Sequence, residues 1–93
     1  MKLASGWSTN SDPGMAAEEA FGRMSAKLGD TPHFILLHSS CAYDNAIVLK
    51  RLRSLAPAAS LQGGTTCLGV VTEEGFHTED GFGLGLLGIC DPD

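Results

Sequence analysis

The feature that most constrains the fold is a run of four apolar residues, Phe34 to Leu37, inside residues 33–40. The run has no polar alternation, which is typical of a strand covered on both faces in a parallel sheet. Segments with helical periodicity lie on both sides of it, at residues 13–28 and 45–56. The chain therefore predicts an α/β fold in which strands and helices alternate.

The first predicted helix has clear boundaries. Asp12 can cap its amino terminus, Pro13 suits the first helical position, and Gly29 can end it. One face carries apolar residues at helical spacing. These are Ala17, Ala20, Phe21, Met24 and Leu28.

The second predicted helix begins after Asp44, a good N-cap, and stops before Pro57. Its buried stripe is expected to be Val48, Leu52 and Leu55. Nearby, Lys50, Arg51 and Arg53 form the only basic cluster, which we interpret as a solvated face.

Two further strands are predicted, one at residues 2–7 before the first helix and one at residues 58–64 after the second helix. We therefore predict three mostly parallel strands with two crossover helices, in three layers or fewer. Residues 67–72 and 81–90 are joined by a polar segment too short for another crossover helix, so they predict an antiparallel hairpin extension. With only 93 residues, the chain is expected to be a single domain, residues 1–93.

Charge and hydropathy narrow the range of partners. The net charge of −5 argues against nucleic acid or an anionic membrane as the main partner. No apolar stretch approaches the roughly 18 residues of a membrane span, and the amino terminus lacks a signal-peptide core. We expect a soluble, cytoplasmic protein with no membrane partner.

Three cysteines with no repeated spacing argue against a disulfide framework, so reduced thiols are expected. Cys41 or Cys67 with His38 or His77 could form a nucleophile and its base, and the same four residues could be considered for zinc. No local signature favours either arrangement. We expect no catalytic residue, no metal and no cofactor, and keep a cysteine-dependent enzyme as the less favoured alternative.

A binding site is expected beyond the carboxyl ends of the predicted parallel strands. Three segments rich in small polar residues converge there, at residues 8–12, 39–44 and 63–67. Their hydroxyls and backbone amides could satisfy a small polar ligand, although the same residue types also make good turns and caps. The candidate ligand-binding residues are Ser39, Ser40, Tyr43, Asp44, Gly63, Gly64, Thr65 and Thr66.

The order of these motifs resembles the amino-terminal module of the FIST domain, a predicted sensory domain of bacterial signalling proteins and eukaryotic F-box proteins. The resemblance covers roughly residues 7–90 and includes an alanine-rich helix, the apolar strand with Tyr43 and Asp44, and the Gly-Gly-Thr-Thr segment at residues 63–66. It implies non-catalytic sensing of a small molecule such as an amino acid, in signal transduction. Family members commonly have Gly-Cys-Ser/Thr at that turn, whereas the cysteine is displaced here to Cys67.

The family unit also pairs this module with a carboxy-terminal companion. Ninety-three residues cannot hold both, so the resemblance implies a piece of a larger protein or a short natural version. In the last predicted strand Gly83 and Gly85 fall on one face, where a flat partner could pack. The alternative function is therefore a protein-interaction module that docks a companion domain or another copy of the chain.

Overall fold

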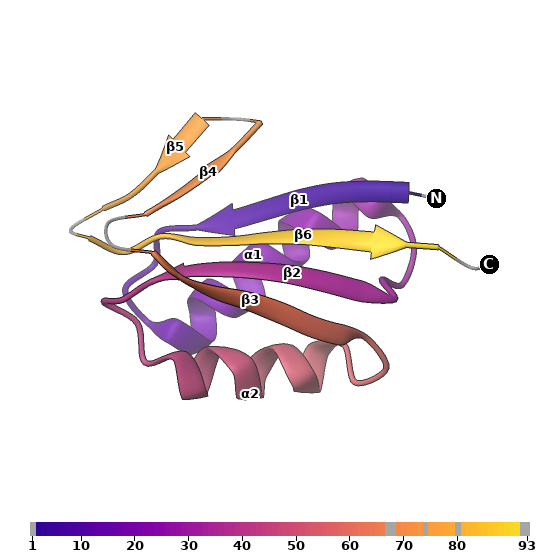
Figure 1. The fold of residues 1–93 in the computed structure, drawn as a ribbon, viewed down its shortest axis with the longest axis horizontal. Coiled ribbons are helices and arrows are strands. Elements are labelled where there is room, and N and C mark those ends of the chain that lie inside the picture. Colours follow the sequence, from indigo (N-terminus) through magenta and orange to yellow (C-terminus); the bar gives the residue numbers. More distant parts are fainter. Residues whose placement is uncertain (1, 67–68, 74, 80, 92–93) are drawn as a thin grey trace.

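The computed structural model describes residues 2–66, 69–73, 75–79 and 81–91. In this part of the chain a four-stranded mixed sheet carries two helices, and a small two-stranded hairpin projects from one end (Figure 1). The fold is thus mixed α/β, as the sequence predicts. The elements are β1 (Lys2–Ser8), α1 (Pro13–Leu28), β2 (Phe34–Ser40), α2 (Asn45–Leu55), β3 (Ser60–Thr66), β4 (Val70–Thr72), β5 (Gly75–His77) and β6 (Leu84–Cys90).

The helix ends confirm the boundary signals in the sequence. The Asp12 carboxylate accepts a hydrogen bond from the Met15 backbone amide at 3.1 Å, and Gly29 ends α1 in the left-handed conformation, with φ 68°. The Asp44 carboxylate likewise accepts from the Ala46 amide at 3.1 Å and caps α2. These ends form locally, because each cap satisfies backbone groups that the helix itself leaves unpaired.

The strand order is β1-β6-β2-β3, which corrects part of the predicted arrangement. β2 and β3 form the expected parallel pair around α2. β1 runs in the same direction as β2 but does not pair with it, because β6 inserts between them and is antiparallel to both. The last strand is therefore central to the sheet. Its run of apolar residues and glycines suits a strand with neighbours on both sides.

The predicted hairpin extension is also placed differently. β4 pairs with β5, and β5 lies within the segment predicted to be only a polar connection. β6 does not pair with β4. A three-residue strand cannot occupy the seven-residue length of β6, whereas β1 and β2 offer matching partners on both sides.

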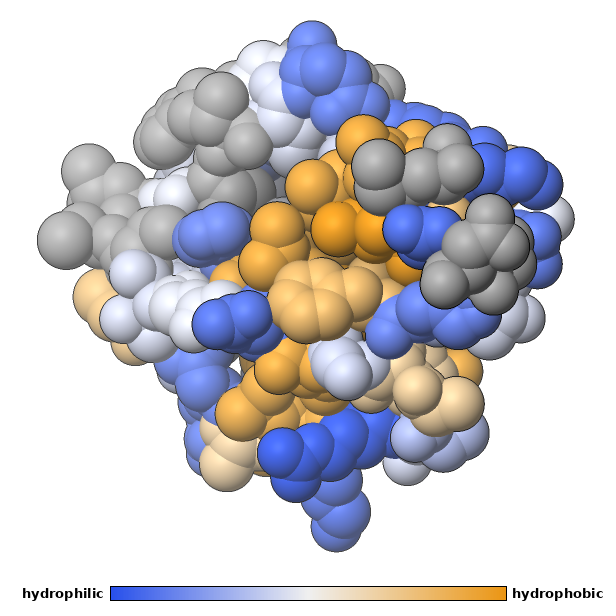
Figure 2. Space-filling model, turned by 45° about the vertical axis from the view of Figure 1, so that its right-hand side comes forward, coloured by the Kyte–Doolittle hydropathy of each residue, from blue (hydrophilic) through white to orange (hydrophobic). Residues whose placement is uncertain are grey.

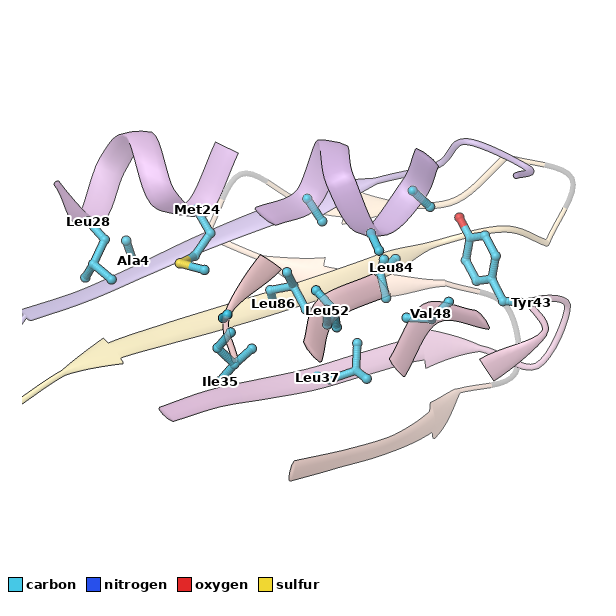
Figure 3. Packing of buried hydrophobic residues seen from close by; sticks show 14 of the residues in the cluster. Ala4, Met24, Leu28, Ile35, Leu37, Tyr43, Val48, Leu52, Leu84 and Leu86 are labelled. Atoms are coloured by element: carbon cyan, nitrogen blue, oxygen red, sulfur yellow. The ribbon is translucent and has the colours of Figure 1, made fainter. Parts of the chain in front are cut away.

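Both helices lie on one face of the sheet, so the domain has two layers (Figures 1 and 3). Arg51 of α2 forms an ion pair with Glu18 of α1 at 2.7 Å, which joins the helices to each other. The core between helices and sheet includes Met24, Ile35, Val48, Leu52 and Leu84, all of which are fully buried (Figure 3).

Glycine allows α1 to lie unusually close to the sheet. A Cβ atom at Gly6 would lie 2.1 Å from the carbonyl oxygen of Ala20, and one at Gly88 would lie 2.3 Å from the sulfur of Met24. Gly6 needs glycine because the clash is with helix backbone, whereas a side chain at position 88 would require the Met24 side chain to move. Ala16, Ala17 and Ala20 are fully buried on the facing side of the helix. This contact is close backbone packing by small residues.

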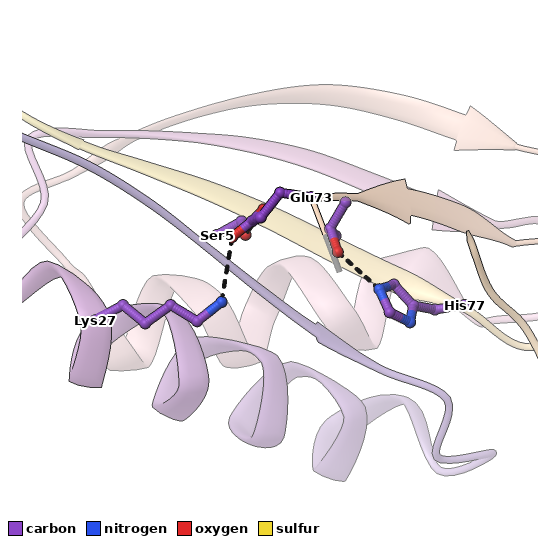
Figure 4. Close-up of polar contacts among 5 residues, drawn as sticks. Ser5, Lys27, Glu73 and His77 are labelled. Carbon is purple, nitrogen blue, oxygen red and sulfur yellow. Dashed lines mark hydrogen bonds and ion pairs between the residues drawn. The ribbon is translucent and has the colours of Figure 1, made fainter. Parts of the chain in front are cut away.

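The hairpin is attached to the edge of the sheet at β1 (Figure 4). The Glu73 carboxylate accepts hydrogen bonds from the Ser5 hydroxyl and, at 3.3 Å, from the Lys27 ammonium group. These bonds, the Ser5 bond above all, lower the pKa of Glu73 to about 2. The His77 ring stacks on Trp7 with 3.8 Å between ring centroids, and Arg23 lies over the same Trp7 ring. The contacts hold the hairpin against β1.

The other face of the sheet carries no helix, and we call it the open face. Its residues follow from the strand register, in rows that cross the sheet. They are Leu3, Ile89, Phe34 and Ser60; Ser5, Leu87, Leu36 and Gln62; and Trp7, Gly85, His38 and Gly64. Figure 2 shows apolar side chains gathered in one continuous area on this side of the molecule. The prediction that β2 is covered on both faces is therefore wrong for the described residues: Phe34 and Leu36 are only half-buried.

No helix in the described ranges is both long and apolar enough to cross a membrane.

Candidate functional site

The predicted convergence of loops is present in the fold. β1, β2 and β3 run in one direction, so Ser8, Ser40 and Thr66 end these strands at the same end of the sheet. The Tyr43 hydroxyl donates a hydrogen bond of 2.7 Å to the carbonyl oxygen of Asn10, which joins the loop after β1 to the loop after β2.

Three of the predicted ligand-binding residues have structural roles at this end. Ser40 is fully buried, and its hydroxyl accepts a hydrogen bond from the Gly83 amide at 3.2 Å. Asp44 caps α2. Tyr43 is buried against Phe82, and this burial, together with the negative charge of Glu19, raises the pKa of Tyr43 to about 12. Ser40, Tyr43 and Asp44 therefore bind the protein itself, as turns and caps do.

Polar side chains in the loop after β1 also form hydrogen bonds within the protein. The Ser8 hydroxyl is buried and donates to the Glu19 carboxylate at 2.6 Å, and the Asn10 side chain donates to the same carboxylate at 3.2 Å. These hydrogen bonds lower the pKa of Glu19. Because Glu19 accepts both donors, residues 8–12 form a structural cluster with little left for a ligand.

Gly63 and Gly64 lie in a strand, as predicted for residues 58–64, but the strand continues to Thr66 instead of ending in a turn, because Gly63 to Thr66 pair with Leu37 to Ser40 of β2. Gly63 is required by close approach: a Cβ atom there would lie 1.7 Å from the carbonyl oxygen of Leu37. Gly64 has open space, with nothing within 4 Å of such an atom. The side chain of Thr66 and the whole of Cys67 lie outside the described part of the chain.

A groove lies between β3 and α2, and we call it the β3–α2 groove. It has a volume of about 430 Å³, and four predicted ligand-binding residues line it: Ser39, Gly63, Gly64 and Thr65. Gly63 and Gly64 add no side chain to the strand side of the groove, between the side chains of Leu61 and Thr65. The remaining lining residues are Leu37, Asn45, Leu49, Arg53, Leu61 and Gln62.

Several polar side chains in the β3–α2 groove can donate hydrogen bonds, and those of Gln62 and Thr65 can also accept them. Ser39 donates its hydroxyl hydrogen to the Asn45 side-chain oxygen, which leaves the Asn45 amide group facing no protein acceptor within the described ranges. Arg53 forms no ion pair with any described residue, and the Thr65 hydroxyl is exposed. A set of N–H and O–H donors with one fixed positive charge suits a carboxylate or another oxyanion.

Asn45 and Arg53 are the groove residues that sequence reasoning missed. Both belong to the row Asn45, Leu49 and Arg53, spaced by four residues, so they share one face of α2. This spacing could have identified them. The sequence interpretation instead assigned Arg53 to a solvated basic face, since nothing in it placed β3 beside that side of the helix.

The geometry of the described residues does not favour a cysteine nucleophile or a metal site. Cys41 is exposed and Cys90 is buried, and neither forms a disulfide among the described residues. His38 is exposed on the open face, while His77 stacks on Trp7 and shares a 2.7 Å hydrogen bond with Thr72. In the ranges that the structure covers, no three His, Cys, Asp or Glu side chains are grouped so that they could hold a metal ion.

Comparison with known proteins adds no assignment. No protein-family model matches the chain, and no curated protein matches it.

Proposed function

We propose that the domain is a non-catalytic binding module that recognises a small polar ligand bearing a carboxylate, such as an amino acid, in the β3–α2 groove. The observation that carries this proposal is that Asn45, Arg53 and Thr65 line one groove with donors that have no protein acceptor among the described residues, Asn45 and Thr65 at one end and Arg53 at the other. Ser39 positions Asn45, and the glycines of β3 let the ligand approach the strand backbone. A sensory role in signal transduction, and the FIST resemblance that suggests it, remain predictions.

The local charge supports a carboxylate ligand. Although the protein as a whole has a net charge of −5, Arg53 supplies a positive charge at this site. No group in the groove is arranged as a nucleophile with its base, which favours binding without chemistry.

The test is a thermal-shift screen with the twenty amino acids and their N-acetyl derivatives. A ligand that binds only the folded state raises the melting temperature. The variant Thr65→Val keeps the side-chain shape and removes the hydroxyl that lines the groove, so it should keep its stability. It should weaken the selected ligand by about 1 kcal/mol if that hydroxyl bonds to it.

Arg53→Gln should abolish most of the binding, whereas Lys50→Gln is a matched control, because Lys50 lies one turn away, outside the groove. A ligand that binds all of these variants as tightly as the parent protein would show that the groove is not its site.

The apolar open face favours a second candidate function, self-association. Leu3 is 58% exposed, and Phe34, Leu36, Leu87 and Ile89 are half-buried beside it. None of the three rows of this face contains Asp or Glu, and the neighbouring Glu73 carboxylate at Ser5 pairs with Lys27. Sedimentation at increasing concentration would test this. Leu36→Lys should keep the protein monomeric if the open face forms the dimer.

A further inference from the structure

We infer that the β3–α2 groove receives its carboxylate-bearing ligand as an extended peptide segment that adds a strand to the free edge of β3. This inference rests on the proposed function and names the class of ligand. Peptides commonly bind in this way, with main-chain hydrogen bonds to an edge strand and pockets for alternate side chains.

The β3 edge is open to such a strand. β3 ends the order β1-β6-β2-β3, so one row of its backbone N–H and C=O groups has no strand partner among the described residues. Proteins commonly block such edges with charged residues, proline or a covering element. The sequence of β3, Ser60–Thr66, contains no charged residue and no proline. At the opposite edge, β1 carries Lys2, and the β4–β5 hairpin is bound beside it.

The length of the groove exceeds what a single amino acid can fill. From Leu61 to Thr65, β3 extends roughly 13 Å at about 3.3 Å per residue. On the other wall, Asn45 and Arg53 are separated by eight helical residues, a rise of roughly 12 Å. The two walls therefore match in length. A segment of about four extended residues spans them, whereas a free amino acid covers only ~3.5 Å.

The charge and chain direction give the peptide an orientation. Asn45 lies at the Thr65 end of the groove, because it bonds to Ser39, which pairs with Thr65. Arg53 lies near the carboxyl end of α2, a few residues before β3 begins, and so at the Leu61 end. A peptide whose terminal carboxylate meets Arg53 therefore runs antiparallel to β3.

The middle of the groove specifies apolar side chains. Leu37, Leu49 and Leu61 line it, and Leu49 and Leu61 are half-buried. The expected occupant is thus a carboxyl-terminal segment with at least one apolar side chain, held by an arginine at its end and by backbone pairing along its length.

The experiment uses the full chain and a bead-displayed library of pentapeptides with free carboxyl termini, from which the tightest binder is taken. Amidation of its carboxyl terminus should weaken binding by about tenfold, because the charged hydrogen bond to Arg53 is lost. Methylation of one backbone nitrogen that faces β3 should weaken it by about fivefold, with every side chain unchanged. Hydrogen exchange of the amides in residues 61–65 should slow when the peptide binds.

The protein variants complete the test. Arg53→Gln should erase the difference between the carboxylate and amide peptides, and the control Lys50→Gln should preserve it. If no library peptide binds, or if the methylated peptide binds as well as its parent, the inference is wrong. If free amino acids bind in a way that depends on Arg53 but no peptide binds, the inference is wrong and the proposed function stands. Absence of both kinds of binding would overturn the proposed function as well.

Discussion

The two helices meet the sheet in opposite ways. α1 lies almost on the backbone of β1 and β6, because Gly6 and Gly88 have no side chains and buried alanines face them. α2 leaves a groove beside β3, although β3 also contains two glycines. In β1 and β6 glycine allows a helix to pack closely, whereas in β3 Gly63 allows close approach to the β2 backbone and Gly64 has open space around it. The amount of glycine does not distinguish a packed contact from a binding groove; the position of the facing helix does.

The largest expected effect is at the packed contact. Gly6→Val should destabilise the fold by about 3 kcal/mol, because the added side chain would overlap the backbone of α1 at Ala20 and Met24. Chemical denaturation measures the change. Wild-type stability in this variant would show that α1 does not depend on close approach to β1.

The two glycines of β3 provide a sharper comparison within one strand. Gly63→Ala should destabilise by about 2 kcal/mol, since its Cβ would overlap the Leu37 carbonyl group. Gly64→Ala is the matched control and should be nearly neutral, because nothing lies within 4 Å of the new atom. Equal unfolding free energies for the two variants would contradict the geometry of this edge.

A glycine of α1 that makes no packed contact should respond in the opposite direction. Gly22 is exposed within the helix, with open space around it. Gly22→Ala should stabilise the protein by about 1 kcal/mol through helix propensity alone. A loss of stability in thermal unfolding would mean that another part of the molecule packs at this position.

The smallest expected effect concerns the hairpin at the β1 edge. The pKa of Glu73 falls from its ordinary value of 4.5 to about 2, chiefly through the Ser5 hydroxyl. The folded state therefore favours the charged form, and its contribution to stability is complete above pH 4.5 and disappears as the pH falls toward 2. Melting temperatures of the parent and Glu73→Gln should accordingly converge at low pH. A constant difference across that range would contradict the assignment.

Local chemistry in the sequence determined much of the fold. The ends of α1 and α2 were predicted from Asp12, Gly29 and Asp44, because a cap depends only on residues next to it in the chain. The strand β2 and its parallel pairing with β3 also followed from the apolar run and the crossover helix between them, although only one face of β2 is covered by helices. For the same reason the sequence correctly brought the loops after β1 and β2 to one end of the sheet.

Tertiary structure alone decided which strand lies in the centre and which polar groups are free. The insertion of β6 between β1 and β2 depends on pairing residues more than forty positions apart, and no local pattern encodes that register. Ser40 and Tyr43 have the composition of a binding rim, but folding brings Gly83 and Asn10 to them as partners. Arg53 resembles a solvated cation in the sequence and lines the groove only because β3 lies beside α2. Sequence specifies which groups can bind, whereas long-range packing determines which of them remain unpaired.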